Sequence, residues 1–480
     1  MGDATLPARL RVSQYFTAVL LICAGLVFLE DLVFGLSYLV AAAAILVPLH
    51  FFRVPRRYYY TVLLAAGTIW LTHLVRPLVL FAQPQGFLYP RILQVNGPLV
   101  NTALLRIAAM AFMMMLGMVV GYRIFGRAAL ARVRDEKGKP ILLRMRVLID
   151  AGLVAVVIFK AFLLIRFGVG FRAGTPDPLL SVLARFAPDY LVYGLLILYL
   201  GKYAHRISFA ERSLHVTLLA GMAVVGLLQG SKAFIAQILL ALFVFYLAFR
   251  GDFSIRLRNA FLLGLAGITV LVVSFPLAMS MRRYVQERGY DLGAFRAGLA
   301  GVAEVVHPEQ ATFVAVWITS RLIGFDGVLA TEVKLPPEFV RVFALEQTAS
   351  RIRGRLVPLN QGAGSVSSGQ AVSTFLIGHP EELRHSGGVG LFAASRLMGG
   401  PVGSMVVVFL FGLAWAAYFS LAERVPSSDA RFLLRYVGVN GIIFLTMSGN
   451  ADYLLPLIVV SVGEILALGL IAPYVYRALR

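Results

Sequence analysis

Three basic side chains, Arg76, Arg106 and Lys160, stand inside long apolar stretches of this sequence. A charged group within a bilayer is costly, so a Lys or Arg there usually faces a cavity or a partner. Acidic residues are scarce in the same stretches, and we therefore expect the missing partner to be an anionic ligand such as a phosphate. The alternative for Arg76 is that its long side chain snorkels to the nearest headgroups.

Three further cations lie beside the ends of apolar stretches: Lys232, Arg282 and Arg283. A phosphate or diphosphate at headgroup level would meet several such donors at once, and the guanidinium fork matches phosphate oxygens in a bidentate way. The sequence therefore predicts an anion site to which all six cations contribute. The alternative for Arg282 and Arg283 is simple binding of bulk anionic lipid.

Candidate acids and bases lie between residues 280 and 400. A neutral imidazole can take a proton from a hydroxyl group, which makes His307 and His379 our candidates for a catalytic base. The alternative is that each is an ordinary solvated side chain. The sequence contains no His-x-x-x-His, His-Glu-x-x-His, Walker, Gly-x-Ser-x-Gly or Rossmann pattern, so we expect no metal, no cofactor and no ATP-driven chemistry. The full candidate set is His307, Glu309, His379, Glu381, Glu382 and His385.

Composition places these residues in a membrane protein. Of the 480 residues, 59% are hydrophobic and 14% are charged, whereas a soluble domain is about half apolar and a quarter charged. Several apolar stretches reach the roughly 20 residues that a helix needs to cross a bilayer. The net charge of +20 is then explained by Lys and Arg in cytoplasmic loops, so no nucleic-acid partner is expected. The single cysteine, Cys23, excludes an intramolecular disulfide.

The apolar stretches predict an all-α, polytopic protein with about twelve transmembrane helices. We divide the chain into a membrane domain at 1–279, a large loop with short helices at 280–400, and a second membrane domain at 401–480. Two short helices are expected in the loop, at 311–323 and 339–345, and a flexible polar stretch at 360–370. The predicted spans are 15–29, 36–52, 61–81, 100–124, 147–167, 189–203, 214–228, 233–249, 261–279, 402–419, 432–447 and 454–474.

Loop charge is consistent with this topology. Lys and Arg collect in alternate connections, such as 125–146, while the connections between them hold few. Because cytoplasmic loops are enriched in Lys and Arg, both termini are expected in the cytoplasm and the loop 280–400 in the periplasm or its equivalent. In this topology Arg76, Arg106 and Lys160 lie at a similar depth in the outer half of the membrane.

Two segments resemble a known family. Gly230-Ser231-Lys232-Ala233, which opens an apolar span after a short outer turn, is similar to the Gly-Ser-Arg/Lys-small signature of Wzy-like O-antigen and exopolysaccharide repeat-unit polymerases. The large outer loop ends in the run Gly-Val-Gly-Leu-Phe-Ala-Ala-Ser-Arg-Leu-Met-Gly-Gly at 388–400, directly before a span, as in the late region of that family. The architecture matches over nearly the whole chain, while the motifs themselves are short.

The resemblance implies a glycosyltransferase that joins oligosaccharide units carried on undecaprenyl diphosphate, at the periplasmic face of a bacterial inner membrane. It also implies a flippase and a chain-length regulator as partners, besides membrane lipid. In this interpretation Arg76, Arg106, Lys160 and Lys232 bind the lipid diphosphate. Arg282 and Arg283 bind phosphate or anionic sugar, and His307 or His379 is the base.

Two other classes of function stay open at this point. An O-antigen ligase would use the same fold and lipid donor with a different acceptor. A secondary transporter or lipid-oligosaccharide flippase also commonly has about twelve spans. Against a transporter stand the absence of repeat symmetry in the sequence and the large outer loop, which a carrier does not need.

Overall fold

The computed structural model describes most of the membrane-spanning stretches and part of the long loop. Described residues are 10–52, 54–55, 58–82, 97–126, 143, 145–167, 188–228, 233–250, 254–255, 292–305, 324–332, 335, 337–356, 389–425, 427–449, 455–456 and 458–467, with scattered positions between 265 and 288.

The described chain is helical apart from one pair of two-residue strands, β1 (Leu10–Arg11) and β2 (Ser254–Ile255). The all-α class is thereby confirmed. The helices are α1 (Val12–Glu30), α2 (Leu32–Phe51), α3 (Tyr59–Ile69), the π-helix η2 (Trp70–Leu74), α4 (Val75–Ala82), α5 (Gly97–Phe125), α7 (Arg146–Phe167), α9 (Asp189–Lys202), α10 (Phe209–Leu228), α11 (Ala233–Arg250), α13 (Leu292–Val305), α15 (Gly324–Ala330), α16 (Pro337–Val342), α17 (Leu345–Leu356), α19 (Leu391–Ala422) and α20 (Ser428–Ser448).

Seven helices among the described residues are long and apolar enough to cross a membrane, which agrees with a helical membrane protein. The helices α1, α9 and α11 and a short apolar helix at 458–467 lie on four more of the predicted spans. The ninth predicted span, 261–279, falls mostly outside the described residues, as do the helix at 311–323 and the polar stretch at 360–370. The total of twelve spans therefore stays a prediction.

Side-chain caps mark the start of two helices. The Asp31 side chain accepts a hydrogen bond of 2.9 Å from the Phe34 amide and so caps α2. Ser427 caps α20 in the same way, accepting from the Ala430 amide at 3.3 Å. Both caps satisfy an amide that would otherwise lack a partner in the first helical turn.

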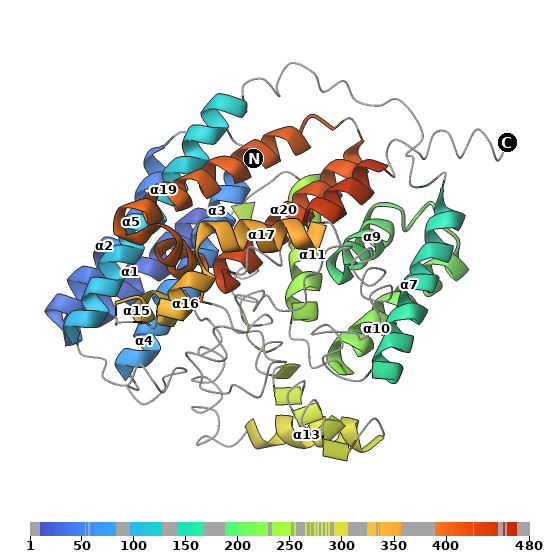
Figure 1. Ribbon diagram of the computed structural model, residues 1–480. Helices are drawn as coiled ribbons and strands as arrows, with labels where there is room; N and C mark the ends of the chain where they lie inside the picture. The colour runs from blue at the N-terminus through green and yellow to red at the C-terminus, as the bar shows by residue number, and fades with distance from the viewer. Residues whose placement is uncertain are drawn as a thin grey trace, which may run out of the picture.

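The described helices form two groups, and α20 contacts both (Figure 1). In one group α1, α2, α3, α5 and α19 pack together, and in the other α7, α9, α10 and α11 do so. Helix α20 contacts α3 and α19 of the first group and α9 and α11 of the second, so it holds the two groups together.

Contacts between basic and acidic side chains agree with the predicted alternation of helix direction. Each of the contacts named below joins two residues that the sequence assigns to the same side of the membrane. Helix ends predicted to share a side therefore do lie together, while the identity of the cytoplasmic side stays a prediction. The outer contacts are Arg76–Asp326, Arg106–Glu332, Arg396–Glu332 and Lys160–Asp189, and the inner ones are Arg146–Glu211, Lys202–Asp429, His215–Asp150 and Arg435–Glu423.

Part of the segment that the sequence assigned to the outer loop lies inside the helical bundle. All seven residues of α15 are buried, and this short helix contacts α5, α19 and η2. Helix α19 begins at Leu391, eleven residues before the predicted span, and breaks at Gly400, where φ is 64° and ψ is −163°. A positive φ and the following Pro401 explain why the predicted boundary falls at this break, although the helix extends beyond it.

Candidate functional site

The outer half of the third span is irregular, and polar side chains gather there. Between α3 and α4 the π-helix η2 widens the helix by one residue per turn, and π-helical turns are frequent at functional sites. Thr72 and His73 lie in this turn, and the Thr72 hydroxyl lies 2.6 Å from His73 Nδ1. Arg76 follows within one turn, so the π-helix sets the directions of three polar side chains.

Arg76 forms a buried ion pair with Asp326 of α15. Its Nε lies 3.2 Å from one carboxylate oxygen and 3.3 Å from the other, and the two side chains are 0% and 1% exposed. This contact corrects the expectation that anions are missing at the level of the buried cations. The carboxylate comes from the long segment after the ninth predicted span, and α15 brings it into the bundle.

A second carboxylate of the same region, Glu332, lies between two arginines. Arg106 of α5 donates a hydrogen bond to Glu332 Oε1, and the Nε of Arg396 on α19 lies 3.7 Å from the same oxygen. At that distance no hydrogen bond forms, and the buried Arg396 Nε–H finds no other acceptor among the described residues. Among the described residues two guanidinium groups face one carboxylate, so these three side chains together carry a charge of +1.

Exposure differs between these two groups of residues. Arg106 is 34% exposed and Arg396 15%, whereas the Arg76–Asp326 pair is closed to solvent. We call Arg106, Glu332 and Arg396 the arginine pair site. It has the accessible cations and the surplus positive charge that an incoming anion needs.

Lys160 also has a carboxylate partner. Its ammonium group contacts Asp189, the first residue of α9, and the contact joins α7 to α9. Thus each of the three cations that the sequence places inside apolar stretches has an acidic partner. The structure brings Arg76 and Arg106 into one region through α15 and the turn that follows it, whereas Lys160 belongs to the other helix group.

Glycines allow α15 to pack deep in the bundle. A Cβ at Gly327 would lie 1.8 Å from the carbonyl oxygen of Val389, and a Cβ at Gly324 would lie 2.7 Å from the His73 ring. The ring also packs against Phe392, with a centroid separation of 4.5 Å and an angle of 38° between the two ring planes. His73 is therefore enclosed on both sides and acts as a packing residue in this arrangement.

The other predicted site residues, Lys232, Arg282, Arg283, His307 and His379, lie outside the described residues. Sequence reasoning did not single out Asp326, Glu332 or Arg396. A usable signal for Asp326 is its position in the short apolar run Gly-Phe-Asp-Gly-Val-Leu-Ala at 324–330, where a charge requires a partner.

Within the described part of the chain, no three His, Cys, Asp or Glu side chains lie together so as to hold a metal ion. No protein-family model, curated protein or solved structure matches this chain.

Proposed function

We propose that this chain is a membrane glycosyltransferase that polymerises oligosaccharide repeat units carried on undecaprenyl diphosphate, at the periplasmic face of a bacterial inner membrane. The observation that supports this function is the arginine pair site. Two arginines share one carboxylate at the predicted outer level of the membrane, and they are more accessible than the buried pair beside them. A diphosphate headgroup has the charge and the oxygen geometry that two guanidinium groups bind.

The proposed reaction is a transfer of the growing chain. The bond between the anomeric carbon of the donor sugar and the diphosphate oxygen breaks, and the acceptor hydroxyl oxygen forms the new glycosidic bond. The hydroxyl proton passes to a base, for which His307 and His379 stay our candidates, and undecaprenyl diphosphate leaves with the bonding electron pair. Negative charge grows on the diphosphate, and fixed guanidinium groups such as Arg106 and Arg396 stabilise it.

A lipid-oligosaccharide flippase or secondary transporter is the second candidate. Transporters often use interrupted helices near their substrate sites. In this chain η2 interrupts the third predicted span, α19 breaks at Gly400, and the short helix α15 is buried between them. An O-antigen ligase remains a variant of the first proposal, with the same donor and a different acceptor.

The location of undecaprenyl-linked units in a strain that lacks this protein separates the three functions. A polymerase defect leaves single units on the periplasmic face, because transport has occurred and only bond formation has failed. A flippase defect leaves them on the cytoplasmic face, and a ligase defect leaves polymer on the lipid. Single units at the inner face, or full-length polymer on the lipid, would rule out the polymerase.

Complementation with single variants then tests the arginine pair site. Removing one charge-assisted hydrogen bond costs about 1.5–3 kcal/mol, so Arg396→Gln and Arg106→Gln are expected to lower kcat/KM roughly 10- to 100-fold. Arg166→Gln is the matched control, since Arg166 is exposed at the predicted outer end of α7. Equal activity of Arg396→Gln and the control would remove Arg396 from the site.

A further inference from the structure

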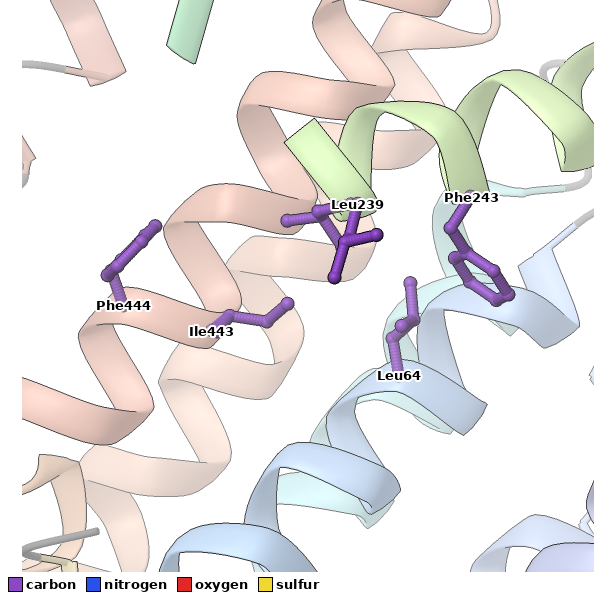
Figure 2. Close-up of a pocket in the computed structure, with 6 residues that line it drawn as sticks. Leu64, Leu239, Phe243, Ile443 and Phe444 are labelled. Atoms are coloured by element: carbon purple, nitrogen blue, oxygen red, sulfur yellow. The ribbon is translucent and has the colours of Figure 1, made fainter. Parts of the chain in front are cut away.

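The membrane-spanning helices are mostly apolar inside and out. Figure 2 shows one apolar region, a pocket of about 320 Å³ on which Leu64, Leu239 and Ile443 converge from α3, α11 and α20. Among the described residues only Leu, Ile and Phe line this pocket, so their side chains offer a polar group no hydrogen bond. A carboxyl group in surroundings of this kind loses its hydration, and it gains nothing in return unless it has a partner.

Glu464 lies in the middle of the last predicted span. Its helix, Ile458–Ala467, is apolar, and Glu464 is about ten residues from each end of the predicted span 454–474. At 1.5 Å per residue this corresponds to about 15 Å from either end, which is near mid-depth of the membrane. Ionisable side chains at this depth are rare, and they usually mark substrate pathways or proton relays.

The Glu464 carboxyl group has no polar partner. Its Oε2 atom is buried and accepts no hydrogen bond from the described residues, although the residue as a whole is half-buried. By contrast, the carboxylates of Asp326 and Glu423 each contact an arginine. An ionised Glu464 would be desolvated and unpaired, whereas its protonated form is neutral and can donate a hydrogen bond.

The neighbouring helices do not supply the missing charge. Helix α9 contacts the helix of Glu464 through Tyr190, and α20 packs against it at Gly441, where an added Cβ would lie 2.7 Å from the Ile458 side chain. The titratable groups of this region are phenols, since the rings of Tyr190 and Tyr436 lie 6.5 Å apart. Ion pairs that α9 and α20 form in the described part of the chain do not include Glu464, and they are Lys160–Asp189, Lys202–Asp429 and Arg435–Glu423.

Hydroxyl groups lie on the predicted outward side of Glu464. Ser461 precedes Glu464 by three residues, so the two side chains are neighbours on the helix surface. The buried Ser461 hydroxyl lies 2.6 Å from the Tyr190 hydroxyl. Tyr190 is in the first turn of α9, which begins at Asp189 at the predicted outer level. A hydroxyl group both donates and accepts hydrogen bonds, so this pair of groups can pass a proton.

We propose that Glu464 is a proton-binding site inside the membrane, and that it exchanges its proton with the outer side through Ser461 and Tyr190. The ligand is the proton itself, and the bound state is the neutral carboxyl group. Carboxyl groups at such depth are the components of proton relays in pumps and transporters. The site is independent of the glycosyl transfer proposed above, so either can fail without the other.

Carbodiimide labelling of the purified full chain tests the protonated state. Dicyclohexylcarbodiimide is hydrophobic and adds to a protonated carboxyl group. The carboxyl proton passes to a carbodiimide nitrogen and the carboxyl oxygen bonds to the central carbon, so the adduct contains every atom of both reactants. We expect an adduct on Glu464 at neutral pH, located by mass spectrometry, and less of it as the pH rises, because the reactive protonated form is lost.

Glu423 is the matched control for this labelling. It is also a buried glutamate, but its two carboxylate oxygens accept hydrogen bonds of 2.6 and 2.7 Å from Arg435, so it should stay ionised and unlabelled. An unlabelled Glu464, or equal labelling of Glu423, would overturn the proposal. Protection of Glu464 by sodium ions at constant pH would mean that a metal cation occupies the carboxylate, and it would overturn the proposal as well.

Infrared spectroscopy tests the route of the proton. The C=O stretching band of a protonated carboxyl group should be present in the wild type and absent from Glu464→Gln, and the shift of this band in D2O reports proton exchange. Tyr190→Phe and Ser461→Ala should each slow the shift. Tyr193→Phe is the control on the same helix, because its hydroxyl donates to the Met222 carbonyl at 3.1 Å.

Equal exchange in Tyr190→Phe, Ser461→Ala and Tyr193→Phe would contradict the route through the hydroxyl pair. A wild-type protein without the carboxyl band would overturn the proton site altogether. The carbodiimide adducts of the wild type decide the protonated state even if Glu464→Gln does not fold.

Discussion

The buried Arg76–Asp326 pair makes a quantitative prediction about stability. Replacing Asp326 by Asn leaves the Arg76 charge in a site that is closed to solvent, and replacing Arg76 by Gln leaves the Asp326 charge there. The double variant Arg76→Gln/Asp326→Asn removes both charges and keeps similar side-chain volumes. We therefore expect each single variant to be less stable than the double variant.

The expected magnitude follows from burial. Removing one partner of a buried ion pair typically costs about 3–5 kcal/mol, because an unpaired charge stays desolvated, whereas replacing both partners costs far less. The exposed pair Arg146–Glu211 is the control, with side chains 42% and 22% exposed and a separation of 3.3 Å. Surface pairs of this kind contribute about 0–1 kcal/mol.

The assay is reversible unfolding of the purified chain in mixed micelles of dodecyl maltoside and sodium dodecyl sulfate, followed by circular dichroism. A double-mutant cycle gives the coupling free energy of each pair. We predict a coupling of several kcal/mol for the buried pair and less than about 1 kcal/mol for the control. Equal couplings, or single variants of Arg76 and Asp326 as stable as the wild type, would refute the buried contact and with it the position of α15.

Two further predictions concern topology and packing. Reporter fusions should place Lys137 in the cytoplasm and Gly364 outside, because Lys and Arg collect in alternate connections. A cytoplasmic Gly364 would place the proposed site on the cytoplasmic side and contradict the proposed topology. Gly327→Ala should reduce the yield of folded protein in size-exclusion chromatography, since its Cβ would lie 1.8 Å from the Val389 carbonyl oxygen. Gly403→Ala meets no atom within 4 Å and should behave as the wild type, and equal yields of the two variants would contradict the close packing of α15.

The sequence predicted the positions of most described helices, because membrane thickness imposes a length on apolar segments that hydropathy reports directly. Charge in alternate loops assigned each helix end to one side of the membrane, and the pairs Lys202–Asp429 and Arg146–Glu211 each join residues assigned to the same side. Hydropathy is a local property of the sequence, and loop charge depends only on the side of the membrane. Both can therefore be read from a single sequence.

The partners of the buried cations could not be predicted in the same way. Asp326 is 250 residues from Arg76 and Glu332 is 226 from Arg106, and no local pattern links residues so far apart. The π-helix at Trp70–Leu74 has no composition signal of its own, since it depends on how the third span packs. The predicted span start at 402 coincides with the break at Gly400, but the helical segment before it, from Leu391, was missed because glycines at 388, 390, 399 and 400 suggested a loop.

The most direct test of the central proposal is bond formation by the purified protein. The full chain, reconstituted into liposomes, receives a defined undecaprenyl-diphosphate-linked repeat unit, and the products are separated by mass. The proposal predicts ladders of two or more units with release of undecaprenyl diphosphate, weakened in Arg396→Gln and intact in Arg166→Gln. Single units that cross the bilayer without any elongation would contradict a polymerase and favour a flippase.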